Sequence, residues 1–184
     1  MQDQIHLTHL QQRAHDQSLR YLYFWGHTQK GTAISKACLS QWYPAAFTVD
    51  GVTYPTAEHW MMVGKARLFD STWVKRIIAN PDPAAAKAFG RKIKNFDQSV
   101  WLQHRFELVV QGNLAKFSQN AALKEFLLAT GDQVLVEASP VDQVWGIGLA
   151  ADDPSAATPA EWRGLNLLGF ALMRVREQLE LCST

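Results

Sequence analysis

Glu58 and Lys65 have residue types and a spacing that could support chemistry. Thr56 can cap a helix that we expect to continue through residue 69. On that helix the carboxylate and the amine share one face and lie roughly 10 Å apart along the axis. The same face also carries the apolar side chains of Met61, Met62 and Phe69. Burying an unpaired charge costs several kcal/mol, so this face lines a wet pocket, supplies partners for both charges or lies at the edge of the core.

A second segment, residues 142–148, combines a carboxylate, a large aromatic ring and two glycines. Gly146 and Gly148 allow the backbone to approach a ligand closely, and Asp142 and Trp145 lie next to them. The spacing is not G-x-G-x-x-G and no helix is expected to follow, so a dinucleotide-binding fold is not supported. The alternative is a tight turn in which Trp145 fills the core.

Aromatic and polar side chains supply further candidates for binding. Trp101 and Arg105 lie at i, i+4 on a long predicted helix, where the arginine can stack on a ring or reach a phosphate. Seven tryptophans occur in 184 residues, and Trp25 is among those next to polar residues or glycine. Aromatic walls suit a flat heterocycle, although they belong more often to a core. Asn166, near the start of the last predicted helix, is interpreted as a cap or a ligand contact.

Motifs for several common hydrolases are missing from the sequence. It contains no G-x-S-x-G and no H-E-x-x-H, and two cysteines are too few for a disulfide framework or a cysteine-based zinc site. His6 and His9 have i, i+3 spacing without a third ligand in register, which favours a solvated helix face. We therefore expect no metal and no cofactor.

The remaining acids, the lysine and the aromatic residues fit cleavage of a glycosidic or N-glycosidic bond. A carboxylate can stabilise an oxocarbenium-like centre or activate water, while a second acid protonates the leaving group. The acids concerned are Glu58, Glu137 and Asp142. A lysine in an apolar pocket could instead attack the anomeric carbon and form an imine.

Composition indicates one globular domain, with 47% hydrophobic and 19% charged residues. The net charge of +1 gives no global electrostatic case for a nucleic-acid or membrane partner. Residues 75–94 carry a local charge of +5 and residues 132–153 one of −5, which usually indicates solvated faces. No apolar run approaches the length needed to cross a bilayer and no secretory signal is visible, so a cytoplasmic protein is expected.

The pattern of elements predicts a mostly helical α+β single domain with a few short strands. Strands are expected at 21–26 and 134–136, with a hairpin around Asp50-Gly51. Helices are expected at 56–69, 71–79, 83–92, 97–118, 120–130 and 164–181, with a loop at 152–159. Residues 1–20, predicted to form a weakly amphipathic helix, are interpreted as an appendage to a domain formed by residues 21–181.

At these residues the chain resembles the YbiA-like NADAR family from about Tyr21 to Leu179. The family usually has Ser-Asn-Phe where this chain has Ser40-Gln41-Trp42, a departure that could change the substrate or be met by the longer reach of Gln41. The matching motifs are Phe24-Trp25-Gly26, Asp50-Gly51-Val52-Thr53-Tyr54, Glu58-His59, Lys65-Ala66, Lys116-Phe117, Glu137-Ala138-Ser139, Asp142 with Trp145-Gly146-Ile147-Gly148, Trp162, Gly164, Asn166, Leu168-Gly169, Met173 and Arg176.

The resemblance implies an N-glycosidase whose pocket contains Glu58, Lys65 and Asp142, and our hypothesis is that these three residues are catalytic. Asp142 or Glu58 would stabilise the ribosyl cation or activate water, and Lys65 would anchor phosphate or act as nucleophile. Arg105 and Lys116 are further candidates for phosphate binding. The expected substrate-binding residues are Phe24, Trp25, Gly26, Trp101, Arg105, Trp145, Gly146 and Asn166.

Three functions follow from the resemblance and the residues together. The first is hydrolysis of a small phosphorylated ribosyl-heterocycle, because family members are linked to ribosylamino-pyrimidine intermediates of riboflavin synthesis and release ribose 5-phosphate. The second is removal of ADP-ribose from guanine in nucleic acid, for which the +5 run is the local support. The third is a non-catalytic module that binds ADP-ribose or a nucleotide.

Overall fold

The computed structural model confirms a mostly helical α+β fold with a few short strands and describes residues 4–13, 16 and 18–182. Its helices are α1 (Ile5–Gln12), α2 (Ala57–Phe69), α3 (Val74–Ala79), α4 (Pro83–Gly90), α5 (Gln98–Gln119), α6 (Ala121–Ala129) and α7 (Leu167–Leu181). The 3₁₀ turns are η2 (Lys36–Leu39), η3 (Ser71–Trp73), η4 (Pro154–Ala157) and η5 (Pro159–Glu161). The strands are β1 (Tyr21–Phe24), β2 (Phe47–Val49), β3 (Val52–Tyr54) and β4 (Val134–Glu137).

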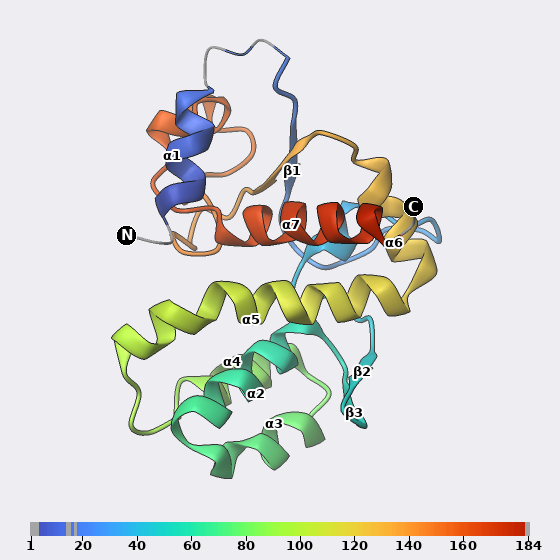
Figure 1. Cartoon of the computed structure of the whole chain (residues 1–184), viewed down its shortest axis with the longest axis vertical. Coiled ribbons are helices and arrows are strands. Elements are labelled where there is room, and N and C mark those ends of the chain that lie inside the picture. Colours follow the sequence, from blue (N-terminus) through green and yellow to red (C-terminus); the bar gives the residue numbers. More distant parts are fainter. Residues whose placement is uncertain (1–3, 14–15, 17, 183–184) are drawn as a thin grey trace.

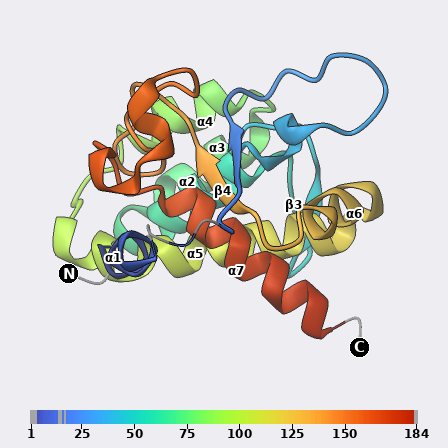
Figure 2. The same ribbon diagram turned by 90° about the horizontal axis from the view of Figure 1, so that it is seen from above.

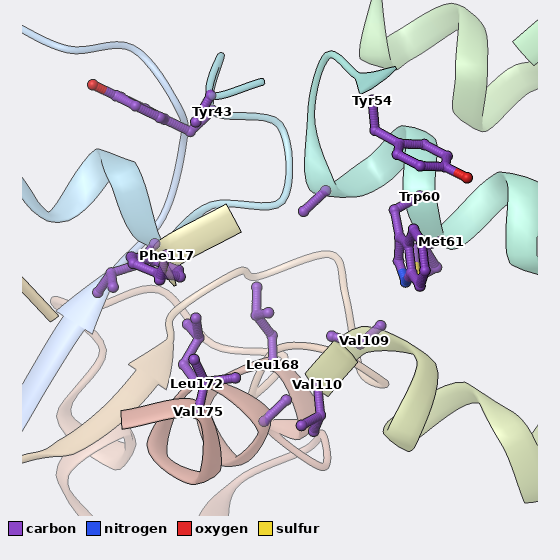
Figure 3. Packing of buried hydrophobic residues seen from close by; sticks show 14 of the residues in the cluster. Tyr43, Tyr54, Trp60, Met61, Val109, Val110, Phe117, Leu168, Leu172 and Val175 are labelled. Atoms are coloured by element: carbon purple, nitrogen blue, oxygen red, sulfur yellow. The ribbon is translucent and has the colours of Figure 1, made fainter. Parts of the chain in front are cut away.

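The long helix α5 crosses the middle of the molecule, with α7 packed on one side and α2 on the other (Figure 1). In the core, Val109 and Val110 of α5 lie near Leu168 and Leu172 of α7 (Figure 3). Helix α4 packs against α2. The helical segment α2–α4 is therefore joined to the rest of the fold largely through α5. None of the helices in the described residues is both long and apolar enough to cross a membrane.

The caps that define α2, α4 and α5 lie where the sequence predicts them. Thr56 accepts a hydrogen bond from the His59 backbone N–H at the start of α2, and Asp97 accepts from two backbone N–H groups of α5. Asp82 caps α4 in the same way, although α4 ends at Gly90 rather than at residue 92. Each cap satisfies backbone donors that a helix end would otherwise leave unpaired.

Other boundaries differ from the sequence prediction. Asn120 makes no side-chain cap to α6, because its amide donates to the carbonyls of Lys116 and Ala46 instead. The last helix begins at Leu167 rather than at residue 164, since Asn166 has a left-handed backbone with φ of 54°. The expected loop at 152–159 includes η4 and the first residue of η5.

The four strands in the described residues form two separate two-stranded sheets. Strands β2 and β3 form the predicted antiparallel hairpin, where Asp50 and Gly51 both have positive φ, as a tight two-residue turn requires. Strands β1 and β4 pair in parallel, so that Phe24 lies opposite Glu137. Figure 2 shows these two strands side by side next to α7. This pairing places Glu137 at the end of a buried strand.

The N-terminal helix α1 packs against η5 (Figures 1 and 2). Leu10 is 6% exposed and belongs to a second apolar cluster with Ile147 and Trp162. His6, expected on a solvated face, stacks on the rings of Phe106 and Phe170 at centroid distances of 4.7 and 5.4 Å. The segment interpreted as an appendage therefore contributes to the packed interior.

Candidate active site

A cavity of about 300 Å³ opens where α2, α4 and α5 meet the ends of β4 and two loops. Its size and its mixture of apolar and polar walls suit a small ligand. The three helices, β4 and both loops all contribute lining side chains. They are Glu58, Met61, Met62 and Lys65 of α2, Lys87 of α4 and Arg91 just after it, Trp101 and Arg105 of α5, Glu137 of β4, and Ser40, Gln41, Trp42, Asp142, Val144 and Trp145 of the loops.

The predicted face of α2 forms one wall of this cavity. Glu58, Met61, Met62 and Lys65 all line it, as expected for i, i+3, i+4 and i+7 positions. Phe69, the last residue on that face, packs against the ring of Phe96 at 5.2 Å instead. The apolar methionines between the two charged residues are therefore part of the cavity wall.

Two glutamates in the cavity wall each have a buried carboxylate oxygen. Glu58 is 2% exposed, and burial raises its pKa to about 7, while Lys87 and a hydrogen bond from Trp42 act in the opposite direction. Burial raises the pKa of Glu137 to about 8, and the charge of Asp142 adds to this rise. Glu58 Oε1 and Glu137 Oε2 have no hydrogen-bond partner among the described residues. Glu137 therefore holds its proton at neutral pH, whereas Glu58 titrates near neutral pH and can accept or release one.

Asp142 is held differently from the two glutamates. Its Oδ1 accepts hydrogen bonds from the backbone N–H groups of Val144 at 2.9 Å and Trp145 at 2.8 Å. Those bonds fix the carboxylate at the turn that begins the Trp145-Gly146 segment. Three carboxyl groups from α2, β4 and one loop thus meet in one cavity.

Lys65 lies toward the other end of α2, among aromatic rings. Its Nζ donates to the Gly90 carbonyl at 2.9 Å and lies 4.5 Å from the centroid of the Phe96 ring and 5.9 Å from that of Trp101. Burial lowers the pKa of this amine. A larger share of neutral amine makes Lys65 a better nucleophile than a solvated lysine.

The cavity also contains more positive charge than the sequence prediction assigned to it. Lys87 and Arg91, four residues apart at the C-terminal end of α4, come from the +5 run at residues 75–94. Their i, i+4 spacing on one predicted helix was the signal that could have identified them. Together with Arg105, which is 6% exposed, they provide donors suited to a phosphate group.

Six of the predicted site residues lie together in this cavity and five do not line it. Glu58, Lys65, Asp142, Trp101, Arg105 and Trp145 line it. Phe24, 1% exposed, belongs to the core, whereas Trp25 is 61% exposed, and neither lines the cavity. Gly26 has a φ of 80° in the segment that follows β1 and is outside the lining as well.

Gly146 and Asn166 pack against the backbone of β4, outside the lining of the cavity. Asn166 Oδ1 accepts from the Glu137 backbone N–H at 2.9 Å and its Nδ2 donates to the Leu135 carbonyl at 2.9 Å. A Cβ on Gly146 would lie 2.8 Å from the Glu137 carbonyl oxygen. Both residues allow the loop and α7 to pack closely on β4 and hold Glu137 in place, and neither lines the cavity.

Lys116, a candidate for phosphate binding, is a structural residue in the observed fold. It is fully buried, and its Nζ donates to the carbonyls of Cys38 at 2.6 Å and Ser40 at 2.9 Å. Gln41 and Trp42, by contrast, were not among the predicted binding residues and line the cavity. Within the part of the chain that the structure describes, no group of three or more acidic, histidine or cysteine side chains could hold a metal ion.

Comparison with known proteins gives consistent matches. The NADAR domain matches residues 23–180. An N-glycosidase of Acanthamoeba polyphaga mimivirus is 39% identical over 165 residues, covering 86% of this chain and 96% of that protein. A riboflavin biosynthesis protein of Vibrio vulnificus is 33% identical over 143 residues, which cover 77% of this chain and 35% of that protein. The NMR structure of Escherichia coli YbiA superimposes with a TM-score of 0.72 at 27% identity, covering 89% of this chain and 87% of that one.

Proposed function

The chain belongs to the NADAR domain family, and we propose that its cavity hydrolyses the N-glycosidic bond of a phosphorylated ribosylamino-heterocycle. Relatives from the mimivirus, Nostoc punctiforme and Escherichia coli are named N-glycosidases, which supports a hydrolase that acts on N-glycosyl compounds. The Vibrio relative is named a riboflavin biosynthesis protein. That name agrees with the ribosylamino-pyrimidine intermediates that the family resemblance implies, for which ribose 5-phosphate would be a product. The observation that carries the proposal is the meeting of three carboxyl groups, one lysine and three further cations in one cavity.

The different surroundings of the carboxyl groups suggest a division of roles. Glu137, whose pKa of about 8 keeps it protonated at neutral pH, donates its proton to the leaving nitrogen as the C1′–N bond breaks. Asp142, fixed by two backbone N–H groups, stabilises the positive charge that develops at C1′. Water then bonds to C1′ and gives its proton to Glu58, whose pKa of about 7 suits a general base.

Lys65 supports a second route at the same carbon. In that route the neutral amine attacks C1′, the C1′–N bond breaks and the heterocycle leaves with a proton. The sugar ring then opens as the C1′–O4′ bond breaks and O4′ takes the remaining Nζ proton, which gives an imine that water later hydrolyses. Borohydride added during turnover would reduce the imine to a stable amine, which mass spectrometry detects as an adduct on Lys65. Lys65→Arg removes the adduct. Turnover without any adduct would assign Lys65 an electrostatic role.

The basic side chains fit the phosphate of such a substrate. Lys87 and Arg91 lie at the end of α4, and Arg105 faces the same cavity from α5. Arginine can bind phosphate oxygens through two parallel N–H groups. Substrates without the phosphate should therefore bind more weakly.

The direct test is release of ribose 5-phosphate from a ribosylamino-pyrimidine 5′-phosphate by the purified protein. Glu137→Gln should lower kcat by about 10²–10⁴-fold, because the amide cannot donate the proton of a carboxylic acid. Glu125→Gln, on the exposed surface of α6, is the matched control and should leave kcat unchanged. Failure of the wild-type protein to release any ribose phosphate would refute the proposal.

Removal of ADP-ribose from guanine in nucleic acid is the second candidate. The observation in its favour is that exposed Lys92 and Lys94 follow Arg91 directly at the cavity. Binding to an ADP-ribosylated oligonucleotide should then weaken steeply as salt increases. Binding that is absent or insensitive to salt would exclude this candidate.

A further inference from the structure

Gln41 departs from the family's usual asparagine, and it is buried in the wall of the cavity. The residue is 7% exposed and lines the cavity. Its carbonyl accepts a hydrogen bond from the Glu58 backbone N–H at 3.0 Å, which fixes it beside the start of α2. Trp42, the next residue, donates a side-chain hydrogen bond to Glu58. Gln41 is thus tied to the residue that activates water in the proposed reaction.

Asn113 of α5 determines which way the Gln41 amide faces. Asn113 Nδ2 donates to the Val109 carbonyl at 2.9 Å and to Gln41 Oε1 at 2.8 Å. The Val109 carbonyl can only accept, so it holds the Asn113 amide with Nδ2 inward. Gln41 must therefore present its oxygen to Asn113 and keep its NH₂ group on the other side.

The NH₂ group of Gln41 has no acceptor in the described part of the chain. A buried donor without an acceptor costs about 1–3 kcal/mol, and a ligand in the cavity can supply the missing acceptor. The lining carboxyl groups Glu58 and Glu137 each have a buried oxygen in the same situation. In the wall of a cavity, a bound ligand can supply the partners that such polar groups lack.

We propose that Gln41 Nε2 is a specificity-determining donor that binds a carbonyl oxygen of the leaving heterocycle. The inference rests on the proposed function, in which the N-glycosidic bond is cleaved among Glu58, Glu137 and Asp142. An oxo-heterocycle satisfies the donor, whereas a heterocycle with an amino group at the same position leaves two donors facing each other. A site built to hydrogen-bond one group discriminates strongly against an analogue that cannot make the bond.

The test uses two ribosylamino-pyrimidine 5′-phosphates that differ only by an oxo or an amino group at one ring position, prepared for each position in turn. At one of these ring positions, the wild-type protein should hydrolyse the oxo compound with a kcat/KM at least about 30-fold higher than that for the amino compound. Gln41→Met, similar in volume but without a donor, should reduce this preference to within about 3-fold. Gln41→Asn should fall between the two because its reach is shorter.

Gln29→Met is the matched control. This substitution also removes a side-chain hydrogen bond, the one that Gln29 Oε1 accepts from the Tyr43 hydroxyl at 2.7 Å, but Gln29 does not line the cavity. The control should keep the full preference for the oxo compound. Calorimetry with ribose 5-phosphate should give the same affinity for Gln41→Met and wild type, because the proposed contact is to the heterocycle.

Equal kcat/KM of wild type for the oxo and amino compounds at every position would overturn the proposal. It would also be overturned if Gln41→Met kept the preference, or if it lost affinity for ribose 5-phosphate in parallel with activity. If neither compound is hydrolysed, the proposed function fails, and calorimetry with the intact compounds still tests Gln41. A preference for the oxo compound in binding would support the donor, and equal affinity would refute it.

Discussion

The buried cations Lys116 and Arg176 of the interior and the glutamates of the cavity wall differ in how their polar atoms are hydrogen-bonded. In the interior, the donors of Lys116 end on backbone carbonyls, and Arg176 donates to Thr130 Oγ1 at 2.7 Å and to the Gln133 carbonyl at 3.0 Å. In the cavity wall, Glu58 and Glu137 each keep an oxygen without a partner among the described residues.

The difference separates structural residues from candidates for chemistry within one family pattern. A buried polar group that the chain satisfies itself stabilises the fold, because a missing partner would cost about 1–3 kcal/mol. A buried group whose partner is missing can interact with a ligand only where it lines a cavity. Asn113 Oδ1 and Gln178 Oε1 also lack a partner among the described residues, but neither residue lines this cavity. Lys65 and Lys116 both match the family pattern, and only the first of them lines the cavity.

The largest expected effect contrasts these two lysines. Lys65→Met should lower kcat by about 10³-fold, because the substrate loses its nucleophile or its cation. Lys116→Met should leave kcat within about 10-fold but lower the free energy of unfolding by about 2–4 kcal/mol, since two buried carbonyls lose their donor. Ribose phosphate release and urea unfolding measure the two quantities. A loss of stability in Lys65→Met equal to that in Lys116→Met would break the comparison.

Aromatic residues give a second contrast of intermediate size. Trp101 lines the cavity, whereas Trp25 is 61% exposed and does not. Trp101→Ala should raise KM by about 10-fold, because stacking of a base on an aromatic ring contributes about 1–3 kcal/mol. Trp25→Ala should change KM by less than about 2-fold, as expected for a ring outside the site. Steady-state kinetics of both variants decide this, and a larger effect from Trp25→Ala would move the binding surface toward the segment after β1.

The smallest expected effect is on the pH dependence of stability. The glutamates of the cavity wall and Lys116 of the interior should change the free energy of unfolding in opposite directions as pH rises. Burial raises the pKa of Glu58 to about 7 and of Glu137 to about 8, from 4.5. The folded state then binds more protons than the unfolded state, so stability should fall as pH rises from about 4.5 to about 8. Burial lowers the pKa of Lys116 from 10.5 to about 7, so its contribution should rise between about pH 7 and 10.5.

Urea midpoints at pH 5, 7.5 and 9.5 test this pattern. Stability should be lowest near pH 7.5. Glu137→Gln should weaken the fall on the acidic side alone, and Lys116→Met should weaken the rise on the alkaline side alone. If Glu137→Gln loses as much stability between pH 5 and 7.5 as the wild-type protein does, the Glu137 carboxyl group does not hold its proton in the folded protein.

Local features of the fold could be predicted from the sequence because their causes lie within a few residues. The caps at Thr56, Asp82 and Asp97 and the turn at Asp50-Gly51 follow from side-chain hydrogen bonds and backbone preferences. The face of α2 followed from helical spacing alone, and it brings Glu58 and Lys65 to one cavity.

Whether each polar residue supports the fold or lines the site was decided only by tertiary structure. The parallel pairing of β1 with β4 joins residues more than 100 positions apart, and no local pattern encodes it. That pairing places Glu137 in the cavity wall and assigns Asn166 to its support. The sequence by itself determined the helices and the chemical groups they carry. Packing determined which buried groups find a partner within the chain, because hydrogen bonds and desolvation depend on neighbours that are distant in sequence.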